Sequence, residues 1–319
     1  MPRAIPITPP IRVEHLDVGQ GHRVALATAG DPRLPAVVII HGGPGSGSRL
    51  RRPLLFDPAQ HRLVWVDQRG CARSRPRGAT RRNTTPLLVR DLEQVRRHLG
   101  LQRWSVYGGS WGAALALAYA GSHPQRVQAL LLRATYLTSR RDTARFVLAG
   151  RRQAPRAWRA LLRAAGATRA DKLLHCCTTV SRNGTSRQRR DLGLSWSRYE
   201  NAMLFRDRPL TKRISAKRVS DILDKNQVHW HFLRHACWLG RQGLRRHVLA
   251  LRDATWPALA VHGRRDRACP AGNLRVLQRW LPRLRVRLID AGHLETDPAM
   301  LRALRAGLGA LLQEARVRA

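Results

Sequence analysis

One serine, one aspartate and one histidine have the types and the order needed for nucleophilic catalysis, although they lie far apart along the 319-residue chain. Ser110 stands between glycines in the stretch GGSWG, residues 108–112, which fits the pattern G-x-S-x-G. A serine hydroxyl is a poor nucleophile at neutral pH, so it needs a base within hydrogen-bond distance and a third group that orients the base. Asp266 and His293 follow Ser110 in the order serine, acid, histidine that sheet-based hydrolases use. We therefore predict that these three residues act together as nucleophile, orienting acid and base.

The pattern around Ser110 is informative only where a strand passes sharply into a helix. Residues 104–107 (WSVY) are predicted as a short buried strand, and residues 111–122 as an alanine-rich helix that ends before Pro124. A serine between such elements is placed on a tight turn, where its hydroxyl is accessible. The context therefore favours a nucleophile over an ordinary polar turn residue.

Asp266 and His293 each follow a predicted strand, residues 256–262 and residues 284–289 respectively. The carboxyl ends of parallel strands meet at one edge of a sheet, which is where such folds gather their active-site groups. Two alternatives stay open, namely that His293 is a surface histidine and that Asp266 pairs with one of its arginine neighbours. The spacing after the two strands favours the catalytic interpretation.

An oxyanion that forms when a serine attacks a carbonyl needs hydrogen-bond donors that are already in position. The backbone N–H of Trp111, directly after the serine, is one expected donor. The second is expected from the glycine-rich loop HGGPGSG, residues 41–47, where Gly43 lets the backbone approach a substrate closely. A phosphate-binding role for this loop is disfavoured, because the Lys-Ser/Thr pair of a P-loop is absent.

Apolar runs that alternate with helical patterns predict an α/β fold with a mostly parallel central sheet. The expected strands are residues 36–40, 63–66, 104–107, 127–132, 256–262 and 284–289, and the expected core helices are residues 85–100, 111–122 and 298–312. Residues 138–245 are rich in arginine and show helical rather than strand spacing, so we expect them to form an inserted all-helical cap. The predicted core is thus residues 1–137 together with residues 246–319.

The composition limits the classes of protein to which the chain could belong. Hydrophobic residues make up 43%, which is typical of a globular chain, and no stretch approaches the roughly 18 apolar residues of a membrane helix. The opening residues do not resemble a signal peptide, and the five cysteines lack zinc-type spacing, so we expect reduced thiols and a cytoplasmic location. The net charge of +39 raises the possibility of a nucleic-acid partner, but the arginines are spread along the chain without a nucleic-acid-binding motif. We therefore expect neither a specific nucleic acid nor a membrane as a partner.

Five stretches occur in an order that resembles a known family. They are HGGPGSG, DQRGCARS, GGSWGAALALAYA, HGRRDRACP and AGH. With them the chain resembles the proline iminopeptidases, which are exopeptidases of the α/β-hydrolase fold that release an N-terminal proline. The resemblance implies Ser110, Asp266 and His293 as the triad, a helical cap, peptides with an N-terminal proline as substrates, and no metal or organic cofactor.

The resemblance also gives the cap a role in substrate binding. The segment WSRYE ends at Glu200, which matches a family carboxylate that binds the free amino group of the terminal proline. Tyr136 and Phe146 fall where the family places aromatic residues around the proline ring. A second family glutamate is missing, because alternative alignments place His229 or Gln227 at its position. We therefore expect amine recognition to depend on Glu200 alone.

Two other functions stay open at this stage. The same triad could act on other N-terminal residues, amides or esters, because fold and triad do not fix specificity. The chain could also be a noncatalytic basic binding protein on a hydrolase scaffold, although the complete set of catalytic residues disfavours this. Cys269 lies three residues after Asp266, so we expect bulky thiol reagents to block access to the site, with a buried inert cysteine as the alternative.

Overall fold

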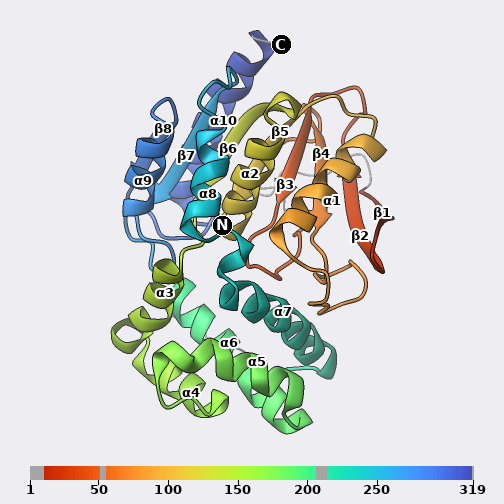
Figure 1. The fold of residues 1–319 in the computed structure, drawn as a ribbon. Coiled ribbons are helices and arrows are strands. Elements are labelled where there is room, and N and C mark those ends of the chain that lie inside the picture. The colour runs from red at the N-terminus through yellow and green to blue at the C-terminus, as the bar shows by residue number, and fades with distance from the viewer. Residues whose placement is uncertain (1–10, 51–54, 206–213, 318–319) are drawn as a thin grey trace.

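A single eight-stranded sheet forms the centre of the molecule, and a group of helices projects from one of its ends (Figure 1). The computed structural model describes residues 11–50, 55–205 and 214–317. The strand order is β1-β2-β4-β3-β5-β6-β7-β8. The strands are β1 (Arg12–Gly19), β2 (His22–Ala29), β3 (Ala36–Ile40), β4 (Arg62–Asp67), β5 (Trp104–Gly109), β6 (Val127–Arg133), β7 (Ala258–Gly263) and β8 (Arg285–Ile289).

The sheet is antiparallel only at the β1–β2 and β2–β4 pairings, and it is parallel from β4 to β8. The strands β3, β5, β6 and β7 therefore end at the same edge, which gathers the loops that follow them. Parallel strands need helical crossovers, which cover both faces and bury the strands almost completely. Strand β5 shows this, because all six of its residues are buried.

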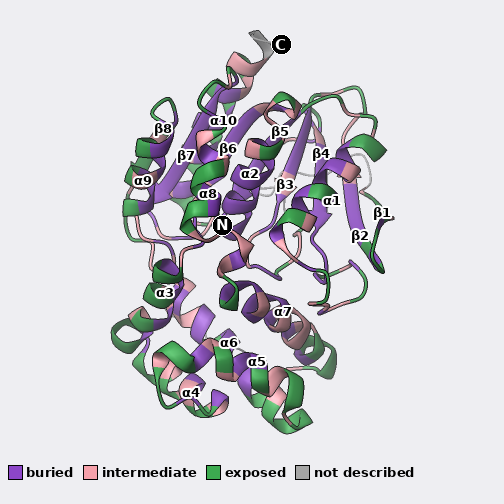
Figure 2. Cartoon of the chain, in the orientation of Figure 1, coloured by how far each residue is buried: buried purple, intermediate pink, exposed green. Residues whose placement is uncertain are grey.

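Two apolar clusters hold the core together, one on each face of the sheet. The inner strands and α2 are accordingly buried (Figure 2). Side chains alternate along each strand, so that in β4 Val64 and Val66 point to one cluster while Leu63 and Trp65 point to the other. The first cluster includes the core helices α1 (Thr85–His98), α2 (Trp111–Ser122), α8 (Gly240–Leu249) and α9 (Gly272–Trp280), and the second includes α10 (Pro298–Val317). The helix α2 is buried along its length because it lies between the sheet, α1 and α8.

In the described residues between β6 and β7, all the regular elements are helices. They include α3 (Arg140–Gln153), α4 (Pro155–Ala165), α5 (Leu173–Asn183), α6 (Ser186–Leu204) and α7 (Ala216–Arg234). We propose that these helices form the cap. The helix α8, which contains the expected boundary at residue 245, packs against α2, and a Cβ on Gly121 would lie 2.3 Å from the carbonyl oxygen of His247.

The predicted fold class is confirmed, because the sheet is mostly parallel and helices cover both of its faces. The β1–β2 hairpin and the helix α9 were missing from the sequence-based prediction. Strand β1 is mostly exposed and carries charged residues, so it lacks the apolar run that marks the inner strands. None of the described helices has the length and apolar character needed to cross a membrane.

Candidate active site

Ser110 lies on the sharp turn between β5 and α2. Its backbone angles are φ 59° and ψ −122°, a conformation that is rare for a residue with a side chain. The turn is tight enough that a Cβ on Gly108 would lie 2.2 Å from the carbonyl oxygen of Gly112, and a Cβ on Gly112 would lie 2.3 Å from that of Ile40. Glycine is therefore required on both sides of the serine, which explains the spacing of the pattern physically.

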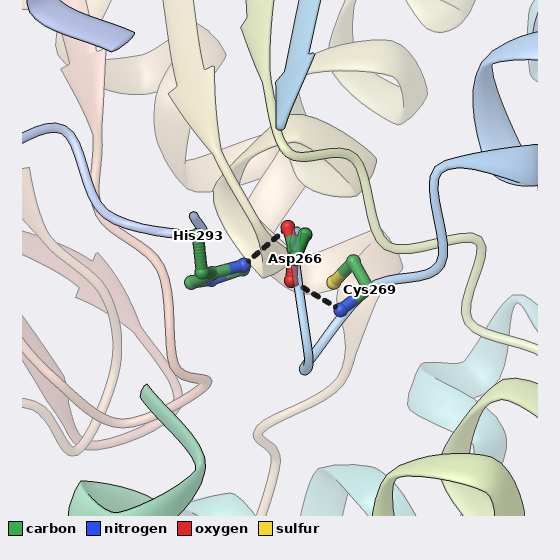
Figure 3. Close-up of side chains that lie close together, drawn as sticks. All are labelled: Asp266, Cys269 and His293. Atoms are coloured by element: carbon green, nitrogen blue, oxygen red, sulfur yellow. Dashed lines mark hydrogen bonds and ion pairs between the residues drawn. The ribbon is translucent and has the colours of Figure 1, made fainter. Parts of the chain in front are cut away.

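The structure brings Asp266 and His293 together, although 27 residues separate them in the sequence (Figure 3). Nδ1 of His293 lies 2.8 Å from Oδ2 of Asp266. The other oxygen, Oδ1, accepts hydrogen bonds of 2.8 Å from the backbone N–H groups of Ala268 and Cys269. Burial alone would raise the pKa of Asp266, but His293 and His262 beside it hold that pKa well below its usual value. The carboxylate is therefore ionised and suited to orient the His293 ring.

The Ser110 hydroxyl interacts with the thiol of Cys269, which adjoins the Asp266–His293 pair. In the described part of the chain no hydrogen bond joins this hydroxyl to His293. Catalytic hydrogen bonds are often long or misaligned in unliganded enzymes and tighten only when substrate binds. Ser110, Asp266 and His293 thus share one small region at the carboxyl edge of the sheet.

Asp266, Cys269 and His293 have possible metal-ligand atoms within 4.8 Å of one another. A metal site would need a thiolate, whereas burial and the negative charge of Asp266 raise the pKa of the Cys269 thiol well above its usual value. Both carboxylate oxygens of Asp266 already accept hydrogen bonds. The donor set therefore fits an acid–base pair beside a protonated thiol better than a metal centre.

The two expected oxyanion donors flank the same turn. Trp111 is the first residue of α2, so its N–H has no acceptor within the helix. Gly43 has a φ of 118°, and its N–H donates to none of the other described residues. A Cβ on the adjacent Gly42 would lie 3.4 Å from the Cβ of Ser110, so this loop passes directly over the serine.

Gln68 connects the elements that carry these donors, a role that sequence reasoning missed. Its side-chain nitrogen donates to the carbonyl of His41 at 2.9 Å, and its side-chain oxygen accepts from the Trp111 indole at 2.9 Å. Its backbone N–H donates to Nε2 of the buried His41 at 3.1 Å. The side chain thus fixes the start of the glycine-rich loop to the start of α2. The motif DQRG, which contains Gln68, was the only signal in the sequence.

Arg133, at the end of β6, was also missed. Its guanidinium donates to the carbonyl of His293, and its own carbonyl accepts from the N–H of Ser110 at 2.8 Å. A Cβ on Gly109 would lie 2.2 Å from this guanidinium, so the arginine lies against β5. Arg133 therefore links the serine turn to the histidine loop. Among the many arginines of the chain, nothing in the sequence set it apart.

Glu200, the expected amine-binding carboxylate, lies on α6 and is 8% exposed. Nζ of Lys225, on α7, lies 2.5 Å from its Oε2, and Nε2 of His229 lies 3.8 Å from its Oε1. Burial alone would raise the pKa of Glu200, but the Lys225 ammonium holds it below its usual value. The expectation that Glu200 acts alone therefore omitted two basic neighbours. Gln227, the other position considered for the missing glutamate, is half-buried on α7.

Tyr136 and Phe146 lie in the segment that leads from β6 into α3. Tyr136 is 8% exposed, its N–H lies 3.5 Å from the carbonyl oxygen of Ser110, and its hydroxyl shares a 2.5 Å hydrogen bond with Thr143. Phe146 is half-buried on α3, and its ring packs edge-on against Tyr199 on α6, with centroids 5.5 Å apart. Tyr136 is thus next to the serine, whereas Phe146 contacts the helix that carries Glu200.

Comparisons with known proteins agree with this geometry. Residues 35–295 match the family described as the alpha/beta hydrolase fold. A protein of Mycoplasma pneumoniae is 34% identical over 93% of this chain and 97% of its own length. The proline iminopeptidase of Neisseria meningitidis serogroup B is 30% identical over 93% of this chain and 95% of its own, and that of Xylella fastidiosa strain Temecula1 is 32% identical over 91% and 93%.

The chain belongs to the proline iminopeptidase family. It is therefore a hydrolase, and the predicted resemblance is confirmed. A crystal structure of a proline iminopeptidase from Mycobacterium smegmatis has a TM-score of 0.61 and 18% identity, covering 97% of this chain and all of that one. A haloalkane dehalogenase from Bradyrhizobium elkani has a TM-score of 0.66 and 16% identity, with 97% and 100% covered. At such low identities these likenesses show the fold alone.

Proposed function

We propose that the protein is a serine exopeptidase that releases an N-terminal proline from peptides through an acyl-enzyme intermediate. The observation that carries this proposal is the match, over more than nine-tenths of the chain, to proteins named proline iminopeptidase. The site described above supplies the groups that this reaction needs. The catalytic roles of the residues are part of the proposal.

In the proposed mechanism, Oγ of Ser110 attacks the carbonyl carbon of the N-terminal proline residue. Nε2 of His293 takes up the proton of this hydroxyl and then passes it to the leaving amine. Asp266 keeps the ring oriented and stabilises the imidazolium, without itself becoming protonated. Water then attacks the prolyl ester on Ser110, with His293 again acting as base.

The negative charge on the carbonyl oxygen is stabilised in this mechanism by the N–H groups of Trp111 and Gly43. Both groups are fixed before the reaction, because the tight turn and the Gln68 bridge hold the two segments together. Such preorganised donors each contribute roughly 10²- to 10³-fold in rate. The backbone thus supplies much of the expected acceleration.

The free amino group of the substrate is proposed to bind Glu200, with Tyr136 and Phe146 against the proline ring. A buried cation needs a compensating charge, and the lowered pKa of Glu200 keeps its carboxylate ionised at neutral pH. A peptide whose N-terminus lies in the cap in this way can be cleaved only after its first residue. Binding of the substrate N-terminus in the cap therefore accounts for the proposed exopeptidase activity.

Activity toward a small substrate panel tests the proposal. We expect turnover of prolyl-β-naphthylamide to exceed that of alanyl-β-naphthylamide, and we expect a fluorophosphonate probe to label Ser110. Equal cleavage of both amides, or faster hydrolysis of p-nitrophenyl acetate alone, would instead favour the broader amidase or esterase function. An unlabelled Ser110 with no turnover of any substrate would favour the noncatalytic binding protein.

A further inference from the structure

The ring of His229 lies between the cap and the glycine-rich loop, in a position that the family resemblance left unexplained. It is 5% exposed, and its Nδ1 lies 3.0 Å from the carbonyl oxygen of Pro44. Because a carbonyl oxygen only accepts, Nδ1 carries the hydrogen, and Nε2 of the neutral ring is left as an acceptor. Burial lowers the pKa of His229 despite the nearby charge of Glu200, which favours this neutral form.

The acceptor atom Nε2 has no hydrogen-bond partner among the residues that the structure describes. It faces Oε1 of Glu200 at 3.8 Å, while Oε2 of the same carboxylate is bound by Lys225. A buried acceptor without a donor is unfavourable, because its lone pair does not regain the hydrogen bond that it lost from water. The unpartnered Nε2 of His229 beside the Glu200 carboxylate therefore marks a place for a group that can donate a hydrogen bond to each of them.

The location of this acceptor pair fits the first residue of a substrate. Pro44, which binds the His229 ring, directly follows Gly43, the proposed oxyanion donor. A Cβ on Gly45 would lie 2.4 Å from the carbonyl oxygen of Lys225, so α7 packs directly on the loop. In an N-terminal residue a single carbon separates the amine nitrogen from the carbonyl carbon, so the amine site must lie close to the oxyanion site.

We propose that Nε2 of His229 and Oε1 of Glu200 each accept one N–H of the protonated prolyl nitrogen, which makes His229 a specificity-determining residue. A protonated secondary amine carries two N–H groups, and one nitrogen can lie within hydrogen-bond distance of two acceptors at this separation. Because Lys225 already offsets the charge of Glu200, recognition depends on the two N–H donors as well as on charge. This inference rests on the proposed prolyl exopeptidase function.

A pair of substrates isolates this contact. Prolyl-β-naphthylamide has two N–H donors, whereas its tetrahydrofuran-2-carbonyl analogue has a ring oxygen of similar shape and none. A site built to bind an N–H group discriminates against an analogue without it by about 10⁴-fold. We expect the wild-type enzyme to prefer the prolyl substrate strongly in kcat/KM.

The variant His229→Asn keeps a side-chain N–H at the position of Nδ1, so the bond to Pro44 survives, and it removes the acceptor at Nε2. We expect the preference for the prolyl substrate to fall by about 10- to 100-fold, mainly through KM, with the analogue cleaved as before. His229→Gln places an amide oxygen near the position of Nε2 and should restore part of the preference. His235→Asn, at an exposed histidine directly after α7, is the matched control and should behave as wild type.

The possible results separate the role of His229 from the proposed prolyl exopeptidase function. An equal loss on both substrates in His229→Asn, or an unchanged preference, would overturn the role of His229 while leaving the prolyl exopeptidase function in place. A wild-type enzyme that hydrolyses p-nitrophenyl acetate but cleaves neither amide would overturn the proposed function, and the role of His229 with it. A selective loss in His229→Asn that His229→Gln reverses supports the inference, because a residue that only fills space would not distinguish the two.

Discussion

The serine turn of the core and the proposed amine site of the proposed cap are built by different means. Around Ser110 the positions of the residues are set by backbone packing, because the glycines permit contacts that are too close for a residue with a Cβ. Around Glu200 they are set by side-chain charges on two helices, with Lys225 and His229 facing the carboxylate. Packed backbone leaves little room for variation, whereas paired side chains on helix surfaces can be exchanged. We infer that the core determines the reaction and the cap determines the substrate.

The strongest test of this division removes the proposed nucleophile. Ser110→Ala should reduce kcat by about 10⁴-fold or more on prolyl-β-naphthylamide and on p-nitrophenyl acetate alike, because both reactions need the same hydroxyl. Steady-state kinetics with both substrates, together with the melting temperature, would measure this. Substantial turnover in a well-folded Ser110→Ala variant would contradict the assignment of the nucleophile.

Removing the charge of the cap carboxylate should affect one substrate only. Glu200→Gln keeps the shape of the side chain but loses the anion, so kcat/KM for prolyl-β-naphthylamide should fall by about 100-fold, in line with about 3 kcal/mol for a hydrogen bond between charged groups. Hydrolysis of p-nitrophenyl acetate should stay within about twofold, since it has no amine. A parallel fall on the ester would show that the cap also supports the reaction.

A methyl group added at the serine turn should be costly in a different way. Gly112→Ala places a Cβ 2.3 Å from the carbonyl oxygen of Ile40, which forces α2 away from β3. Such overpacking destabilises a protein by about 1–3 kcal/mol, and kcat should fall on every substrate. Gly309→Ala on α10 is the matched control, because nothing lies within 4 Å of its Cβ, and it should add about 0.5–1 kcal/mol of stability. Denaturant unfolding of both variants measures the difference.

The same contrast explains what could be predicted from the sequence. The inner strands are continuous apolar runs, and the serine turn needs glycine at fixed spacing, so both left a local pattern in the chain. Lys225 approaches Glu200 from another helix, 25 residues further along the chain. Nothing about a single lysine at that position predicted this pairing. Arg133 and Gln68 act through bonds to distant backbone groups, which no local spacing reveals. Elements with a periodic pattern were predictable, whereas side-chain partners across the fold were not.

The ion pair in the cap should also control the pH range of amine binding. Burial raises the pKa of Glu200 and Lys225 lowers it, so in Lys225→Met the effect of burial remains and that pKa should rise above its usual value. Glu200 would then become protonated as the pH falls from 7 toward 5, and kcat/KM for the prolyl substrate should drop there more steeply than in wild type. Dividing by the rate on p-nitrophenyl acetate removes the pH dependence of the catalytic steps that both substrates share. Lys217→Met, at the exposed start of α7, should leave the profile unchanged.

The smallest expected effect concerns the thiol beside the triad. Cys269 is 3% exposed, and burial and the charge of Asp266 raise the pKa of its thiol, so it should react slowly with thiol reagents at neutral pH. Cys269→Ala removes a partner of the Ser110 hydroxyl but no group that takes up a proton, so kcat should stay within about threefold of wild type. A mercurial that does reach Cys269 should inhibit by filling the space around Ser110, and Cys269→Ala should abolish that inhibition. Full activity of wild-type protein after complete labelling of Cys269 would show that substrate reaches the serine by a path that avoids the thiol.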